Sequence, residues 1–160
     1  MRDIGISKVK CMKKVSSLVL SCLTTALVWI NSLLPGTVSG AQSSFFSAPI
    51  ARLLNDFLNW PVDPDIIHAV IRKMAHFVEF SIVGGLWCLT IFLHGWGRKK
   101  ETWIAIAIAG AVALCDETIQ IFVPGRAFSV WDIAIDVLGG LFGAFFVQGW
   151  MIRKEKKILF

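Results

Sequence analysis

Four apolar runs, each about 20 residues or longer, dominate this sequence. They cover residues 15–34, 66–93, 103–122 and 131–150. An α-helix needs about 20 predominantly apolar residues to cross the hydrocarbon core of a bilayer. The sequence therefore predicts an all-α integral membrane protein with four transmembrane helices.

The composition supports a membrane protein and argues against a nucleic-acid-binding protein. Of the 160 residues, 56% are hydrophobic and 17% are charged, which is too apolar for a soluble domain of this size. A net charge of +5 is also typical of proteins that bind nucleic acid. Here, however, the basic residues lie in short clusters beside the apolar runs, with no basic and aromatic patch to follow a phosphate backbone. Membrane lipid is the expected partner, and nucleic acid is not.

The distribution of basic residues predicts the orientation in the membrane. Twelve of the sixteen Lys and Arg residues lie before the first run, between the second and third, or after the fourth. Cytoplasmic loops carry an excess of Lys and Arg. We therefore expect a single domain over residues 1–160 in the cell membrane, with both termini cytoplasmic and basic tails at residues 1–14 and 151–160.

The first run has a second interpretation. A basic start followed by an apolar run is also typical of a secretory signal, with Val38 and Gly40 as small residues before a cleavage point. The run is longer than the usual h-region of about 7 to 15 residues, which favours a retained span. Both interpretations leave the following residues outside the cytoplasm.

The segment between the first two spans predicts a loop and a short helix. Residues 35–47 are rich in Gly, Ser and Thr and are predicted to form the loop. From Pro49 to Trp60, apolar residues recur at helical spacing opposite polar ones. We expect a helix over residues 49–60 that lies in the membrane interface. A helix packed on the outer ends of the bundle is the alternative.

Polar residues recur near one end of the last three spans. On the second span Arg72, His76 and Glu79 share a helix face, as do Asp116 and Gln120 on the third. With the predicted orientation, all of these residues lie in the outer leaflet. We expect one polar cluster, open to the outside, formed by Arg72, Lys73, His76, Glu79, Asp116, Glu117, Gln120, Arg126, Asp132 and Asp136.

The charges of this expected cluster do not balance. Three basic residues face five carboxylates, which leaves two negative charges before His76 is considered. A protonated carboxyl, a charged His76, an exposed residue or a bound cation would each reduce the difference. Arg72, Lys73, Gln120 and Arg126 are candidates for binding an anionic group, because guanidinium groups bind phosphate or carboxylate in a bidentate manner.

The order and spacing of these residues resemble the VanZ-like family of bacterial membrane proteins. The resemblance covers about residues 30–150 and rests on three motifs together: R72-K-x-x-H76-F-x-E79-F80, D116-E-x-x-Q120-x-F-x-P-x-R126 and D132-x-x-x-D136 followed by Gly139, Gly140 and Gly143. It implies a multi-span protein of the cell envelope of Gram-positive bacteria that lowers susceptibility to the glycopeptide teicoplanin. It supplies no established catalytic residue, and Phe80 stands where family members often carry Tyr.

Three classes of function remain open. The first is non-enzymatic binding or shielding of an envelope component, with a lipid-linked cell-wall precursor or a glycopeptide as partner. The second is an enzyme acting on a lipid-linked or membrane-embedded substrate, with His76, Glu79, Asp116 and Glu117 as candidate catalytic residues. The third is a small proton-coupled carrier, which with four spans would require a homo-oligomer.

Two structural interpretations compete with these functions. The charged residues could act only as an ionic clamp that holds the helices in register, and the glycines could only allow close helix approach. The sequence also offers a metal site formed by His76 and Glu79 with Asp116 or Asp132 opposite. The neighbouring basic residues argue against it, so the sequence predicts no metal and no cofactor.

Overall fold

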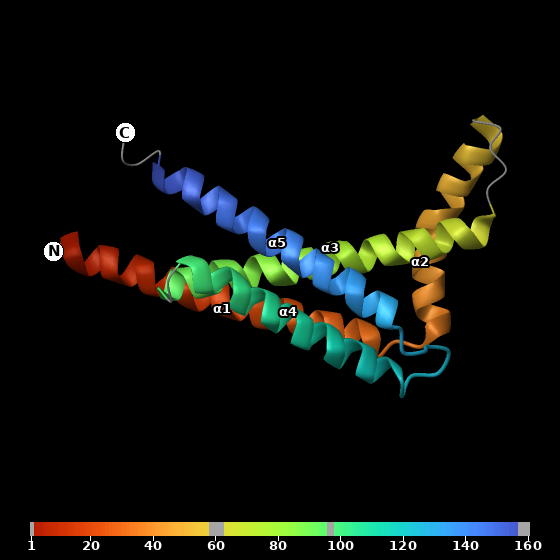
Figure 1. Cartoon of the computed structure of the whole chain (residues 1–160), viewed down its shortest axis with the longest axis horizontal. Helices are drawn as coiled ribbons and strands as arrows, with labels where there is room; N and C mark the ends of the chain where they lie inside the picture. The colour runs from red at the N-terminus through yellow and green to blue at the C-terminus, as the bar shows by residue number, and fades with distance from the viewer. Residues whose placement is uncertain (1, 58–62, 96–97, 157–160) are drawn as a thin grey trace.

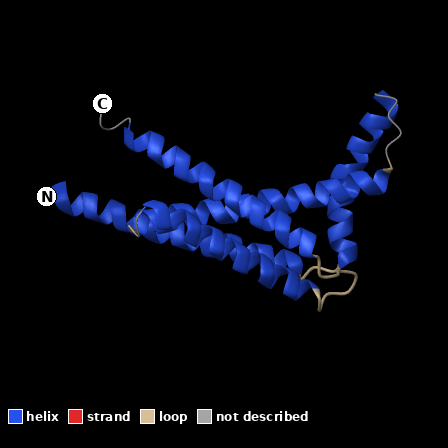
Figure 2. Ribbon diagram, in the orientation of Figure 1, coloured by secondary structure: helices blue, strands red, loops and turns tan. Residues whose placement is uncertain are grey.

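The computed structural model describes residues 2–57, 63–95 and 98–156, and these ranges are helical apart from short turns and caps (Figure 2). The elements are α1 (Arg2–Ser32), α2 (Gly36–Arg52), the π-helical turn η1 (Leu53–Phe57), α3 (Pro64–His94), α4 (Arg98–Gln120) and α5 (Val130–Lys156). The predicted all-α fold is confirmed.

The four predicted transmembrane helices are confirmed by length and hydropathy. The candidate spans are Lys8–Ser32, Pro64–His94, Lys100–Gln120 and Val130–Lys154. Helix α4 ends two residues earlier than the sequence predicts, because turn hydrogen bonds replace the helical ones before Pro124. There Phe122 N donates to Ile119 O and Val123 N donates to Gln120 O. A residue that precedes proline is disfavoured in the helical conformation.

Helices α1, α3, α4 and α5 run along the long axis of the molecule, while α2 crosses one end of them (Figure 1). The first turns of α1 and the last turns of α5 lie at the opposite end (Figure 1). We call these the loop end, where α2 and the connection between α4 and α5 lie, and the termini end. Because the start of α1 and the end of α5 lie at the same end of the bundle, the structure agrees with an even number of membrane spans. The cytoplasmic location of this end stays a prediction.

The predicted loop over residues 35–47 is wrong, because most of this segment belongs to α2. Helix α2 begins after Pro35 as the N-cap, and Pro49 lies inside the helix rather than at its start. Serine side chains fit here because they donate to carbonyls of the preceding turn, as Ser43 Oγ does to Ser39 O at 3.1 Å. The helix also contacts α3, where His68 Nε2 donates to Gly40 O at 3.1 Å.

The helix predicted over residues 49–60 is therefore the last part of a longer element. Residues 49–52 belong to α2 and residues 53–57 to η1, while residues 58–60 lie outside the described part of the chain. The contact of α2 with α3 agrees with the alternative of a helix packed on the end of the bundle. Its depth in the membrane interface stays a prediction.

Helices α3 and α5 form the most extensive helix pair in the molecule, and glycine makes their close approach achievable. A Cβ atom on Gly143 would lie 1.8 Å from Ser81 O, and one on Gly139 would lie 2.4 Å from Phe77 O. No side chain fits at such distances. The predicted role of these glycines in close helix packing is confirmed, and Gly139 sets the spacing beside His76 and Asp136.

Helix α1 joins this pair through small polar contacts and an apolar core. Ser21 Oγ and Thr90 Oγ1 lie 2.8 Å apart, and Trp87 Nε1 donates to Thr25 Oγ1 at 3.1 Å. Around them lies a buried apolar cluster formed by Val28, Phe80, Val83, Ala109, Val112 and Ala113. Many large apolar side chains on the outer faces of the helices stay exposed, as expected for surfaces that contact lipid.

Candidate functional site

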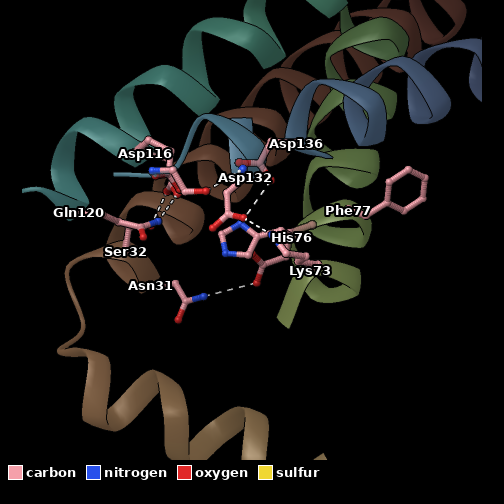
Figure 3. A network of polar contacts seen from close by, with 12 residues as sticks. Asn31, Ser32, Lys73, His76, Phe77, Asp116, Gln120, Asp132 and Asp136 are labelled. Atoms are coloured by element: carbon pink, nitrogen blue, oxygen red, sulfur yellow. Dashed lines mark hydrogen bonds and ion pairs between the residues drawn. The ribbon is translucent and has the colours of Figure 1, made fainter. Parts of the chain in front are cut away.

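The loop end of the bundle holds a cluster of polar side chains from four helices (Figure 3), and the connection between α4 and α5 adds Arg126. Helix α1 contributes its last residues, α3 contributes residues 72–79 near its middle, α4 contributes its last two turns and α5 contributes its first two turns. We call this set the polar cluster. It consists of Asn31, Ser32, Arg72, Lys73, His76, Glu79, Asp116, Glu117, Gln120, Arg126, Asp132 and Asp136.

The centre of the polar cluster is formed by one imidazole and two carboxylates. His76, Asp116 and Asp136 come from α3, α4 and α5, and each offers a nitrogen or oxygen atom within 4.8 Å of the other two. His76 Nδ1 lies 3.2 Å from Asp136 Oδ1. Asp116 and Asp136 are both fully buried, and the His76 side chain is 12% exposed. These three helices therefore meet at titratable side chains.

Asp116 is held by two hydrogen bonds from neighbouring side chains. Ser32 Oγ donates to Asp116 Oδ1, and Gln120 Nε2 donates to Asp116 Oδ2 at 2.9 Å (Figure 3). Ser32 is the last residue of α1, and Gln120 lies one helical turn after Asp116 on α4. Two donors stabilise the charged form of a buried carboxylate and limit its rotation. The orientation of Asp116 is thus set by α1 and α4 together.

Glu117 determines where α5 begins. It accepts a hydrogen bond from Ser129 N at 2.7 Å, and Ser129 Oγ in turn accepts one from Asp132 N at 3.2 Å. Ser129 is thus the N-cap of α5, with the serine oxygen satisfying a free backbone donor of the first turn. The carboxylate at a helix N-terminus also interacts favourably with the helix dipole. Glu117, a candidate catalytic residue, makes a structural contact here.

Lys73 and Asp132 form an ion pair at the edge of the polar cluster. Lys73 Nζ lies 2.7 Å from Asp132 Oδ1, with side chains that are 45% and 14% exposed. Nearby, Asn31 Nδ2 lies 3.5 Å from Glu79 Oε1. These contacts occupy Glu79 and Asp132, two of the residues that the sequence placed near a metal.

Two arginines lie close together in the polar cluster, and we call Arg72 and Arg126 the arginine pair. Arg126 donates to the end of α1, from Nε to Leu34 O at 3.1 Å and from its guanidinium to Asn31 O at 3.2 Å. Burial lowers the pKa of the Arg126 guanidinium, and the positive charge of Arg72 lowers it further. Within the described residues, Arg72 Nε is buried and has no hydrogen-bond partner.

The structure brings together the side chains that the sequence placed in one cluster, with an exposed edge at Lys73 and a buried centre; that the exposed edge faces the outside stays a prediction. Asp116, Glu117, Gln120 and Asp136 have no exposed surface. The reason is that α1 and the connection between α4 and α5 cover them, with Gly36 N donating to Pro124 O at 3.0 Å. The functional roles of the predicted site residues stay predictions.

Sequence reasoning missed two members of the polar cluster, Asn31 and Ser32, and the neighbouring contact of Ser129. Asn31 and Ser32 contact Glu79 and Asp116, and Ser129 contacts Glu117. The only signal was their position, since Asn31 and Ser32 interrupt the end of an apolar run and Ser129 precedes the fourth span. Such residues are common at helix ends in any protein.

Comparison with known proteins gives one match. The VanZ/LLP1 family model matches residues 17–152 of this chain, a longer range than the resemblance in the sequence covered. No curated protein matches the chain, and no solved structure does. The match spans most of the 160 residues and includes all four candidate membrane spans for most of their length. The chain therefore belongs to the VanZ/LLP1 family, as a multi-pass membrane protein.

Proposed function

We propose that this protein binds an anionic group of a membrane-embedded envelope component without changing it chemically. The component would be a lipid-linked cell-wall precursor, and its binding or shielding would lower susceptibility to glycopeptides such as teicoplanin. Membership of the VanZ/LLP1 family supports a role at the envelope. The local contacts of the arginine pair support the anionic character of the ligand.

The observation that carries this proposal is the arrangement of Arg72 and Arg126. Burial is the main cause that lowers the pKa of the Arg126 guanidinium, and the like charge of Arg72 lowers it further, while Asp116, Glu117 and Glu79 act in the opposite direction. Arg72 Nε is also a buried donor without a partner among the described residues. A phosphate or carboxylate between the two guanidiniums would relieve the repulsion and satisfy that donor.

The test uses Arg72→Gln in a susceptible Gram-positive host. Membrane abundance and teicoplanin susceptibility are scored in the same cells. Purified protein is also titrated with vesicles containing an isoprenyl diphosphate lipid. We expect normal abundance, loss of protection and binding weakened about tenfold, since a hydrogen bond to a charged group contributes about 1.5 to 3 kcal/mol.

The matched control is Arg52→Gln, because Arg52 is an exposed arginine at the end of α2 and lies outside the polar cluster. It should keep both protection and lipid binding. The proposal fails if the wild-type protein does not bind the diphosphate vesicles, or if Arg72→Gln binds them as tightly as the wild type does.

An enzyme acting on a lipid-linked substrate is the second candidate, and the pairing of His76 with Asp136 favours it. A carboxylate close to an imidazole is a common arrangement for a general base, and His76 Nδ1 lies 3.2 Å from Asp136 Oδ1. The two functions differ in one measurement. Incubation of the lipid with protein would give a new lipid product for an enzyme, lost in His76→Gln, and unchanged lipid for a binding protein.

A further inference from the structure

We propose that His76, Asp116 and Asp136 form a binding site for one divalent transition-metal ion, of the Mn²⁺ or Zn²⁺ type. The site lies at the centre of the polar cluster, where the three side chains converge from α3, α4 and α5 (Figure 3). This inference goes beyond anion binding by the arginine pair. It stands on different residues and is tested by a different measurement.

The spacing of the donor atoms is the first argument. His76 Nδ1 and Asp136 Oδ1 are 3.2 Å apart, yet they are not aligned for a hydrogen bond. Two neighbouring ligands on one ion, each about 2.1 Å from it, lie roughly 3.0 to 3.4 Å apart. The third donor, from Asp116, lies within 4.8 Å of the other two atoms. Two ligands of one ion, each about 2.1 Å from it, lie at most about 4.2 Å apart, so binding requires the Asp116 oxygen to move a few tenths of an ångström towards the ion.

The second argument is that the Asp136 carboxylate is buried without accepting a hydrogen bond. Its side chain has no exposed surface, and His76 Nδ1 lies 3.2 Å from Oδ1, yet neither Oδ1 nor Oδ2 accepts a hydrogen bond in the described part of the chain. Buried carboxylates are normally paired, hydrogen-bonded or bound to a metal. His76 Nδ1 and Gln120 Oε1 are likewise buried without a hydrogen-bond partner among the described residues. His76 Nδ1 and the Asp136 oxygens thus lie together with electron pairs that a cation can accept, and Gln120 Oε1 belongs to the side chain that donates to the third ligand, Asp116.

The third argument is the charge of the polar cluster. Lys73 and Asp132 cancel as an ion pair. The remaining charged members are two basic residues, Arg72 and Arg126, and four acidic ones, Glu79, Asp116, Glu117 and Asp136. The difference is two negative charges in a region with little exposure to water. One divalent cation brings the cluster to neutrality with His76 uncharged.

The surroundings of Asp116 are those of an oriented ligand. Ser32 Oγ and Gln120 Nε2 each donate to one of its oxygens. Outer partners of this kind orient metal-binding side chains in many sites. The donor atoms also limit the choice of metal ion, because Mg²⁺ and Ca²⁺ prefer sites whose ligands are all oxygen atoms. One imidazole with carboxylate and amide oxygens suits Mn²⁺ or Zn²⁺.

This site differs from the metal-ligand set that the sequence suggested, which was His76 and Glu79 with Asp116 or Asp132. That set included Glu79 with Asp132 as an opposite ligand, whereas Glu79 faces Asn31 and Asp132 binds Lys73. Asp136 takes the place of both. Two of the basic residues that argued against a metal contact other groups, since Lys73 pairs with Asp132 and Arg126 donates to the Leu34 and Asn31 carbonyls.

The test measures Mn²⁺ binding by the full chain in detergent after treatment with a chelator. Electron paramagnetic resonance detects free Mn²⁺, and we expect the protein to remove one equivalent from solution, with Zn²⁺ as a competitor. In protein labelled with ¹⁵N-histidine, pulsed resonance should show coupling of the bound Mn²⁺ to one imidazole nitrogen. Asp136→Asn should bind Mn²⁺ at least about tenfold more weakly.

Two controls test whether the effect is local. Asp132→Asn removes a carboxylate from the same helix that is paired with Lys73, and His68→Gln removes an imidazole from α3 that contacts Gly40 O. Both should bind Mn²⁺ as the wild type does, and so should Arg72→Gln, which tests the anion proposal separately.

The proposal is overturned if the wild-type chain binds no Mn²⁺ or Zn²⁺, or if bound Mn²⁺ shows no coupling to a histidine nitrogen. It is also overturned if Asp132→Asn weakens binding as much as Asp136→Asn does. Should Asp136→Asn fail to accumulate, the histidine coupling in the wild type and in His68→Gln decides the question.

Discussion

Helices α3 and α5 contact each other along most of their length, but the chemistry of the contact changes from one end to the other. At the loop end they meet through His76 and Asp136, and the neighbouring α4 adds Asp116. Towards the termini end the contact is made by glycine and apolar residues, such as Gly143 against Ser81 O. Cys88, Ile91, Ala105, Ala144 and Met151 form the apolar cluster there.

This difference shows that packing alone does not require the charged residues. A charge near the centre of a span costs about 2.5 to 3.5 kcal/mol on insertion scales. The same two helices pack closely with small and apolar residues over the rest of their contact. The carboxylates and the imidazole at the loop end are therefore expected to serve binding or chemistry as well as structure.

The largest effect is expected for Gly143→Ala. The added Cβ would lie 1.8 Å from Ser81 O, a backbone atom that cannot move without shifting α3. We expect a loss of at least about 3 kcal/mol and low abundance in the membrane, at the upper end of overpacking effects. Thermal unfolding in detergent measures it, with Gly149→Ala as the control because no atom lies within 4 Å of the added Cβ. Wild-type stability of Gly143→Ala would show that the glycine contact is not tight.

A smaller effect is expected for Ser32→Ala at the loop end. This change removes a donor from the fully buried Asp116 carboxylate, so the unfolding free energy should fall by about 2 kcal/mol. Thermal unfolding of the purified variant is the measurement. The matched control is Thr24→Ala on the same helix, whose exposed hydroxyl bonds only Leu20 O. Equal melting temperatures for the two variants would contradict the special role of the loop end.

The hydroxyl pair nearer the termini end should contribute less. Ser21 Oγ and Thr90 Oγ1 are 2.8 Å apart in a buried position between α1 and α3. A double-mutant cycle with Ser21→Ala and Thr90→Val should give a coupling of about 0.6 kcal/mol, the average for polar contacts between membrane helices. A coupling as large as the Ser32 effect would remove the contrast between the two ends.

The smallest effect is expected for Lys73→Gln. Its ion pair with Asp132 is short, but the lysine side chain is 45% exposed, so the attraction is screened by water. We expect a change of about 0.2 kcal/mol in the unfolding free energy, as for exposed pairs in general. Chemical or thermal unfolding at low and high salt measures it. A decrease in the unfolding free energy as large as that of Ser32→Ala would mean that the edge of the polar cluster is as well shielded from water as its centre.

The sequence predicted the membership of the polar cluster better than its contacts. Helical spacing placed His76 and Glu79 on one face, and both lie in the cluster. The same spacing could not show that His76 faces Asp136 while Glu79 faces Asn31, since that depends on the rotation of α3 against α1 and α5. The helix over Gly36–Arg52 was missed because its serines satisfy their hydroxyls within the helix and its stability comes from contact with α3.

The sequence by itself determined the four spans, because hydropathy and length act locally along the chain and each span satisfies its own backbone hydrogen bonds. It also identified the family motifs. Only the tertiary structure decided which polar groups meet and how deeply they are buried. Those properties depend on the distance between helices, which Gly139 and Gly143 allow to be short, and on the cover that α1 and the connection between α4 and α5 provide.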